Sequence, residues 1–390
     1  MTDSGQPILQ FGTSRFLQAH VDLFVSEAAE SGQALGGITV VQTTGNPARS
    51  ARLRAIARPQ GFDIVVRGLI DGAPVTMRKT CRAVRAALDA RSQWPLVRQQ
   101  MRGPVRVVVS NTGDAGWALD TGDSATRLAA SAAAPISFPA KLLVLLHDRW
   151  RADPDTALTL LPCELVSRNG DQLRRIVVEL AGAWSCPAPF IDWLLAHVVW
   201  ANSLVDRIVS EALEPVGAVA EPYALWAVER QPRLVLPCTH PAIVLTDDLE
   251  RFERLKLFLL NLGHTLLAQQ WLRGRHAADM TVLQAMHDAP MREALESAWA
   301  DEVLPVFDAM GQGNEARAYL SELRSRLLNP FLAHRLADIA QNHAQKTRRR
   351  IEPLLALAAQ RAPALAQPRL RAALESSAKV RDRTWNGWAW

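Results

Sequence analysis

The first part of the chain alternates short apolar runs with stretches of helical periodicity. Residues 7–11 and 37–42 read as buried strands, and about 15–30 reads as the helix between them, which is the size of a β–α–β unit. The same patterns predict strands at 62–69, 76–79, 105–109, 158–161 and 223–228, with an Asp71-Gly72 turn after the first of these, and helices at 139–152, 170–183 and 188–202. This alternation predicts an α/β domain with a largely parallel sheet.

Strand patterns disappear after about residue 249, and helical periodicity dominates. Helices are predicted at 250–272, 279–287, 290–309, 313–340 and 342–359. We therefore place a domain boundary near residue 245, with domains at 1–245 and 246–390. The tail ends in three tryptophans, which could pack on the body or on a partner chain: Trp385, Trp388 and Trp390.

Composition narrows the class of protein. A length of 390 residues is too great for one ordinary core, and 48% apolar with 21% charged residues is typical of a soluble globular protein. A net charge of +5 without an aromatic-interleaved basic stripe argues against nucleic acid, and fits a small anionic substrate. No apolar run reaches membrane-spanning length, and the four cysteines lack zinc spacing, so we expect a cytoplasmic protein with no metal.

The first strand runs directly into a glycine and then a helix, as at the start of a Rossmann turn, where a pyrophosphate binds at the helix N-terminus. Ser14 stands where the usual fingerprint has its second glycine. The candidate coenzyme-binding residues of this turn are Phe11, Gly12, Thr13, Ser14, Arg15 and Phe16.

The end of the second strand bears on the choice between NAD and NADP. A carboxylate there binds the ribose 2′-hydroxyl, whereas an arginine accepts a 2′-phosphate. The segment after Gln42 contains no carboxylate, and Arg49 and Arg52 follow. We therefore expect NAD(H) or NADP(H) as the cofactor, and the residues slightly favour NADP or the use of both.

One stretch of the second domain combines chemical groups with an apolar setting. Lys256, Asn261 and His264 share one broad face of a predicted helix that is otherwise Leu- and Phe-rich. Burial would lower the pKa of a lysine toward the range of a general acid/base, and an amide and an imidazole beside it could hold an oxygen-bearing substrate. The alternative is a snorkelling lysine and a satisfied core histidine.

Several segments together resemble the polyol-specific long-chain dehydrogenases, the mannitol dehydrogenase family, and within it the tagaturonate and fructuronate reductases. Its Lys-x4-Asn-x2-His motif matches Lys256, Asn261 and His264. Other matching segments are Gln10–His20, Ser110–Gly116, Phe138–Lys141, Pro162–Leu165, Asn169-Gly170, Asn202–Ile208, Asn329–Phe331 and Lys346. The departures are Ser14, Gln18 and Gly113-Asp114, all at or near the coenzyme side.

The resemblance implies an α/β Rossmann-type N-terminal domain followed by a mostly α-helical C-terminal domain, with a nicotinamide coenzyme. It implies Lys256 as the general acid/base, Asn202 and Asn261 as donors to the reacting oxygen, and His264 as a residue that orients substrate. Lys346 would likewise orient the substrate. Lys346 and Arg349 could pair with a substrate carboxylate, and a solvated surface side chain is the alternative for Arg349. The residues that bind the coenzyme would also include Ser110, Asn111, Thr112 and Glu164.

The expected reaction is hydride transfer between the coenzyme and a linear sugar acid. A mannitol-type enzyme acting on neutral polyols, a non-catalytic relic that binds nucleotide or sugar acid, and a helical interaction module remain as alternatives. The sequence leaves open whether the chain is a monomer or a homodimer.

Overall fold

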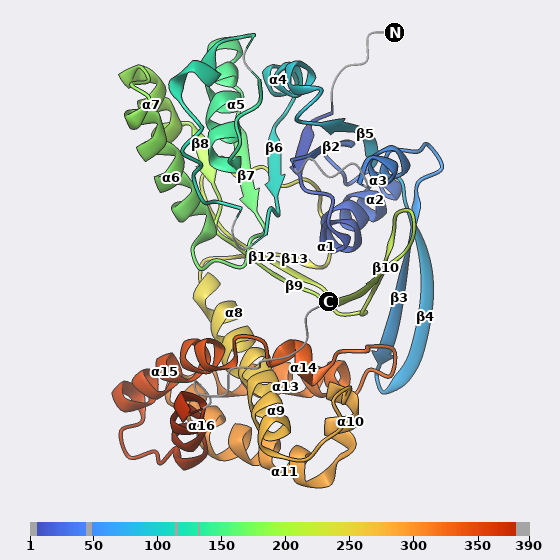
Figure 1. Ribbon diagram of the computed structural model, residues 1–390, viewed down its shortest axis with the longest axis vertical. Helices are drawn as coiled ribbons and strands as arrows, with labels where there is room; N and C mark the ends of the chain where they lie inside the picture. The colour runs from blue at the N-terminus through green and yellow to red at the C-terminus, as the bar shows by residue number, and fades with distance from the viewer. Residues whose placement is uncertain (1–5, 44–48, 114–115, 132, 380–390) are drawn as a thin grey trace. The chain divides into compact units, whose positions relative to one another are not determined.

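The computed structural model describes residues 6–43, 49–113, 116–131 and 133–379. The chain folds into two compact units (Figure 1). One comprises Met1–Val66 with Thr76–Leu249, and the other comprises Arg67–Val75 with Glu250–Trp390. The tip of one long hairpin therefore groups with the helical unit, a division that a single cut near residue 245 does not anticipate.

A six-stranded parallel sheet forms the centre of the first unit. Its strands are β1 (Ile8–Phe11), β2 (Ile38–Gln42), β5 (Val84–Asp89), β6 (Val107–Ser110), β7 (Leu158–Pro162) and β8 (Val198–Trp200). They lie in the order β5-β2-β1-β6-β7-β8. Counting these strands along the chain gives 3-2-1-4-5-6, which is the Rossmann order, so the predicted fold class is confirmed.

Helices cover both faces of this sheet (Figure 1). Leu9 and Phe11 belong to a core with the helices between residues 94 and 196, whereas Ile8 and Val40 belong to a core with the helical run between residues 15 and 30. Alternate residues of a strand point to opposite faces, and this burial on both sides explains the near-continuous apolar runs. The helices are α1 (Arg15–Leu17), a π-helical segment η1 (Gln18–Asp22), α2 (Leu23–Glu30), α3 (Arg49–Ile56), α4 (Trp94–Arg102), α5 (Phe138–Ala152), α6 (Asn169–Ala183) and α7 (Ala188–Ala196), with a 3-10 turn η2 (Ala125–Leu128).

The remaining named strands form two smaller sheets. One has the order β10-β11-β3-β4 and the other β13-β12-β9. The predicted hairpin turn is confirmed, because Asp71 and Gly72 both have positive φ angles, of 51° and 77°. The strands are β3 (Phe62–Ile70), β4 (Ala73–Cys81), β9 (Ser203–Asp206), β10 (Val209–Ala212), β11 (Ala218–Ala220), β12 (Leu225–Glu229) and β13 (Ile243–Thr246).

The second unit is built from helices around one core that includes Leu259, Trp299 and Phe307. Its helices are α8 (Leu249–Leu255), η3 (Lys256–Asn261), α9 (Leu262–Arg273), α10 (Val282–His287), α11 (Ala289–Ala298), η4 (Trp299–Val303), α12 (Leu304–Ala309), α13 (Gly313–Leu327), α14 (Leu336–Ile339), α15 (His343–Arg361) and α16 (Pro368–Lys379). The segments η3 and η4 are π-helical turns within longer helical runs.

Two predicted helices are wrong in extent. The helix predicted at 188–202 ends at Ala196, and 198–200 forms the sixth strand of the sheet. A short Val-Val-Trp run fits a buried helix and a buried strand equally well by periodicity. The helix predicted at 313–340 ends at Leu327, because Pro330 lacks an N–H and restricts the residue before it.

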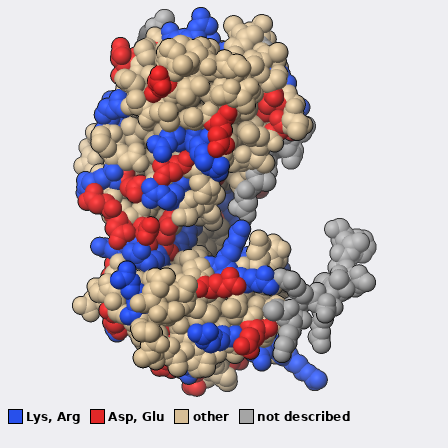
Figure 2. Space-filling view, turned by 90° about the vertical axis from the view of Figure 1, so that its left-hand side faces the viewer, with Lys and Arg blue, Asp and Glu red and all other residues tan. Residues whose placement is uncertain are grey.

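The described surface carries both basic and acidic side chains (Figure 2). On the face in Figure 2, basic and acidic side chains are interspersed. Among the described residues, no helix combines the length and apolar character needed to cross a membrane. All four cysteines are buried free thiols.

Asp22 is a fully buried carboxyl at the end of the π-helical segment η1, and burial raises its pKa to about 8. The folded-state pKa exceeds the unfolded value of 3.8, so the buried carboxyl costs no stability below pH 3.8, where both states are protonated. As the pH rises from 3.8 through the folded-state pKa, the free energy of unfolding falls, because only the unfolded state ionises readily. We expect Asp22→Asn to stabilise the protein by at least about 1 kcal/mol at pH 8 and to have little effect at pH 4. Urea unfolding at the two pH values measures this.

Asp155→Asn is the matched control, because Asp155 is exposed. An effect of Asp22→Asn that is the same at both pH values would contradict the assignment of a buried, protonated carboxyl.

Candidate active site

The carboxyl ends of β1 and β6 meet at the point where the strand order reverses, which is where open α/β sheets bind their ligands. Gly12 follows β1 with a φ of 123°, and a Cβ built on it would lie 2.8 Å from the Asn111 carbonyl oxygen, directly after β6. Because the chain passes this close to its neighbour at a positive φ, only glycine fits this turn. The turn suits a pyrophosphate.

The rest of the turn is fixed by local hydrogen bonds. Ser14 has an extended backbone, and its hydroxyl accepts a hydrogen bond from the Leu17 N–H as an N-cap. The departure from glycine at this position therefore causes no strain. Gln18, the second departure, is buried and donates to the Thr13 carbonyl while accepting from the Gly217 N–H.

The predicted coenzyme residues of the turn differ in exposure. Thr13 is buried, Phe16 is half-buried and stacks on His20, and Arg15 is exposed and donates to the Ser210 carbonyl. Phe11 is fully buried with its ring against Phe138, so its side chain belongs to the core.

Glu164, after β7, holds the second loop of this edge. Its carboxylate accepts hydrogen bonds from the Ser110 hydroxyl at 2.9 Å and from the Thr112 N–H and hydroxyl, each at 3.0 Å. The Asn111 side chain donates to the Cys163 carbonyl. Glu164 is 6% exposed, so it fixes the backbone of residues 110–112 rather than facing solvent.

Replacement of Gly12 tests this edge. We expect Gly12→Ala to weaken binding of reduced nicotinamide coenzyme at least about tenfold, because alanine strains the φ and contacts the Asn111 oxygen. Quenching of tryptophan fluorescence measures the affinity. Gly182→Ala is the control, since a Cβ on Gly182 in α6 meets nothing within 4 Å. Equal coenzyme affinity of Gly12→Ala and the parent would refute the role of this turn.

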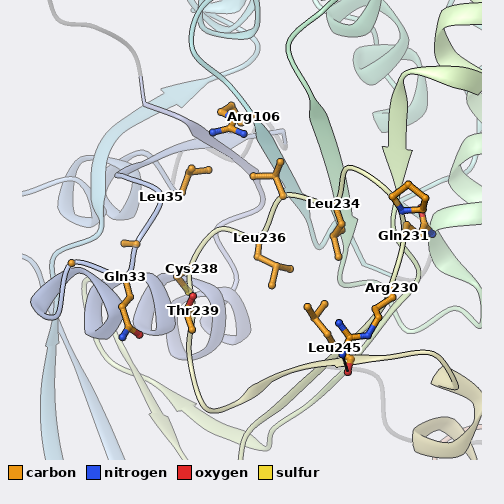
Figure 3. Close-up of a pocket in the computed structure, with 14 residues that line it drawn as sticks. Gln33, Leu35, Arg106, Arg230, Gln231, Leu234, Leu236, Cys238, Thr239 and Leu245 are labelled. Carbon is orange, nitrogen blue, oxygen red and sulfur yellow. Dashed lines mark hydrogen bonds between the residues drawn. The ribbon is translucent and has the colours of Figure 1, made fainter.

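A cavity of about 830 Å³ in the same unit is lined by residues that include Leu35, Arg106 and Leu245 (Figure 3). Leu35 precedes β2 and Arg106 precedes β6, so the cavity borders the amino ends of the strands. Coenzymes bind at the carboxyl ends of such sheets. This cavity is therefore distinct from the coenzyme edge, which is formed by the turn at Gly12 and the loop after β6.

In the helical unit, Lys256 and Asn261 begin and end the π-helical turn η3. The Leu262 N–H bonds to the Leu257 carbonyl, the i to i+5 pattern of a π-turn. In a π-turn, residues five apart are separated by a smaller angle around the axis than in an α-helix, so Lys256 and Asn261 lie nearer to the same side. The Lys256 side chain is half-buried, rather than enclosed as the apolar run predicts, whereas Phe258 to Leu260 are buried.

His264 lies three residues after Asn261, one turn further along α9. Its side chain is 8% exposed, and its Nε2 is buried without a hydrogen-bond partner. Burial holds the pKa of His264 well below 6.5, and the neighbouring His334, Arg350, Arg326 and Lys346 lower it further. The imidazole is therefore neutral near pH 7 and can donate to or accept from a hydroxyl.

Helix α15 brings two cations to this region. Lys346 donates to the Ile339 carbonyl at 3.1 Å, and burial followed by the Arg350 charge lowers its pKa. Arg350 donates to the Asn261 carbonyl at 2.9 Å and to the Thr265 hydroxyl at 2.7 Å, which fixes the end of the π-turn. Arg349 is exposed and borders a separate groove with Arg348, so the structure does not bring it to this cluster.

Asn202 lies in the first unit and is fully buried. Its Nδ2 donates to Asp171 at 3.2 Å and to Glu229 at 2.7 Å, and its Oδ1 accepts from the Asp171 N–H at 3.1 Å. Both amide hydrogens are thus engaged. These hydrogen bonds make Asn202 a support for the start of α6, and its role as a donor to the substrate stays a prediction.

Sequence reasoning missed two members of the helical cluster, Arg350 and His334. The i, i+4 spacing from Lys346 could have identified Arg350 in place of Arg349. His334 carries no comparable signal, because it lies in an irregular segment between α13 and α14. Within the described parts of the chain, no group of three or more His, Cys, Asp or Glu side chains is arranged to hold a metal.

Comparison with known proteins gives two family matches and a set of relatives. The mannitol dehydrogenase Rossmann domain matches residues 6–236, and the mannitol dehydrogenase C-terminal domain matches residues 248–372. The altronate oxidoreductase of Halalkalibacterium halodurans is 30% identical over 369 residues, which are 89% of this chain and 69% of that protein. The altronate oxidoreductase of Klebsiella pneumoniae is 31% identical over 391 residues, 94% of this chain and 78% of that protein.

Two solved structures share the fold. A substrate-free D-sorbitol dehydrogenase superposes with a TM-score of 0.79 at 18% identity, covering 98% of this chain and 82% of that one. A Pseudomonas fluorescens mannitol 2-dehydrogenase, in ternary complex with NAD and D-mannitol, gives 0.73 at 19% identity, covering 97% and 80%. With both domain models matched in order over most of its length, this chain belongs to the mannitol dehydrogenase family.

Proposed function

We propose that this protein is a nicotinamide-dependent oxidoreductase that interconverts a linear sugar acid and its keto form, with an altronate-type substrate. The observation that carries the proposal is the π-turn that begins at Lys256 and ends at Asn261, with the neutral His264 on the next turn. The altronate oxidoreductases, at 30–31% identity over most of the chain, support the substrate class.

The coenzyme edge of the first unit fits the proposed cofactor. A turn that only glycine can form, beside the start of a helix, leaves room for a pyrophosphate. Gly12, Thr13 and Ser14 would hold the phosphates, and the loop of Ser110, Asn111 and Thr112, fixed by Glu164, would border the other end. When bound, the nicotinamide accepts or donates the hydride.

Residues of the helical unit transfer the proton and stabilise the charge that develops on the substrate oxygen. During reduction, negative charge develops on the substrate carbonyl oxygen, and the Asn261 amide donates a hydrogen bond to it. Lys256 delivers a proton to that oxygen and removes it in the reverse direction. His264 hydrogen-bonds a neighbouring hydroxyl, and Lys346 pairs with the substrate carboxylate. Arg350 positions Asn261 through its backbone oxygen.

We propose that the coenzyme site accepts NAD(H) and NADP(H). Strand β2 ends at Gln42 rather than at a carboxylate, so the strand itself offers no acidic partner for a ribose 2′-hydroxyl; the carboxylate of Asp89 belongs to the neighbouring strand β5, opposite Gln42. Arg52, in the first turns of the following helix, pairs with Glu214 at 3.4 Å and supplies positive charge nearby.

A substrate panel tests the function. Altronate, mannonate and mannitol are each offered with NAD⁺ and with NADP⁺, and reduced coenzyme is followed at about 340 nm. We expect the highest kcat/KM with altronate. Highest activity on mannitol would instead favour a polyol dehydrogenase of the same family. Coenzyme binding, seen by tryptophan fluorescence, with no turnover on the panel would favour a non-catalytic binding protein.

A further inference from the structure

Two imidazoles from different parts of the helical unit meet beside the proposed substrate residues. His264 on α9 and His334, between α13 and α14, have ring centroids 4.9 Å apart at an interplanar angle of 76°. His264 is more than nine-tenths buried, yet its Nε2 has no hydrogen-bond partner. A buried polar atom without a partner is costly, and such atoms in native proteins commonly await a ligand or a water.

The charges around the pair are mostly positive. Lys346 and Arg350 on α15 and Arg326 on α13 all depress protonation of His264, and Lys346 also depresses that of His334. Asp338 on α14 opposes them at His334, and its side chain is exposed. Three cations act on the neutral His264 and one of them, Lys346, also acts on His334, so a negatively charged group would be attracted to this position.

We propose that His334, with His264 and Lys346, forms the subsite for the carboxylate of the sugar acid, and that His334 thereby determines selection of acids over neutral polyols. This inference rests on the proposed function and names a residue for its specificity. A neutral imidazole donates one N–H to a carboxylate oxygen, and an ammonium has three N–H donors, one of which Lys346 gives to Ile339. A hydroxymethyl group in place of the carboxylate gains much less from these donors.

The backbone of the segment holds His334 in place independently of its side chain. The His334 carbonyl accepts from the Val282 N–H at 2.9 Å, and the next residue pairs with Thr281 in a β-bridge. Upstream, the Asn329 side chain accepts from the Phe331 N–H and donates to the Arg67 carbonyl. A substitution of the imidazole should therefore leave the fold intact.

The experiment compares altronate with altritol, which differ in a carboxylate against a hydroxymethyl group. Binding of each to the protein with reduced coenzyme is measured by titration calorimetry. We expect His334→Asn and His334→Phe each to weaken altronate binding about tenfold or more and to change altritol binding less than about twofold. His287→Asn, at an exposed histidine of α10, should change neither.

Equal losses for both ligands, or no loss for altronate, would overturn the subsite. The outcome is separable from the proposed function. Turnover of altronate by the parent, without a selective effect of His334, rejects the subsite alone. Selective altronate binding that depends on His334, in a protein that turns over nothing on the panel, rejects the oxidoreductase assignment and supports the subsite.

Discussion

Lys256→Ala is expected to lose at least about a hundredfold in kcat on altronate while binding coenzyme as the parent does. General acid–base catalysis by one positioned side chain typically contributes 10²–10⁴-fold. Lys256 lies at the start of the π-turn in the helical unit, whereas the glycine turn proposed for the coenzyme belongs to the Rossmann unit. Steady-state kinetics and fluorescence titration with reduced coenzyme measure the two properties separately.

Arg273→Ala is the matched control for this variant, because Arg273 is an exposed cation at the end of α9. It should retain activity. Normal turnover by Lys256→Ala would show that the proton is transferred by another group, and joint loss of coenzyme binding and turnover would point to a structural role.

Asn261→Ala is expected to lower kcat about a hundredfold and to change KM little. An interaction made only as charge develops on the oxygen affects turnover rather than ground-state binding, and removal of one such donor typically costs about 3 kcal/mol. The backbone oxygen of Asn261, which accepts from Arg350 and Thr265, is unaffected by the substitution. Kinetics over a range of substrate concentrations separates the two parameters.

Asn261→Asp sharpens this test, since it keeps the shape and places negative charge where the oxygen becomes negative. Its loss should exceed that of Asn261→Ala. Asn314→Ala, at an exposed position on α13, serves as the control. A change confined to KM in Asn261→Ala would show that the amide does not stabilise the transition state.

The fold is largely readable from the sequence where burial is strong and elements are long. Strands such as β1, β6 and β7 are apolar runs that end at loop residues, so their positions follow from periodicity. Strand β8 does not, because Val198–Trp200 continues an apolar stretch begun by α7. The break after α13 was available from Pro330, whose effect on the preceding residue outweighs the helical pattern.

The candidate site depends on features that periodicity does not encode. The motif places Lys256, Asn261 and His264 on one helix, but an α-helical wheel separates Lys256 from Asn261 by about 140°. The π-turn reduces this separation, and helical periodicity does not predict where a π-turn forms. His334 meets His264 across about 70 residues of chain, and such a contact requires the tertiary structure.

Chemical rescue tests the central claim most directly. Lys256→Ala is assayed on altronate with increasing concentrations of small primary amines, such as methylamine and ethylamine. If Lys256 transfers the proton, turnover should rise with amine concentration, follow the amine's pKa, and leave the activity of the parent unchanged. Full activity of Lys256→Ala without amine would contradict the account, as would a failure of every amine to restore turnover in a variant that still binds coenzyme and substrate.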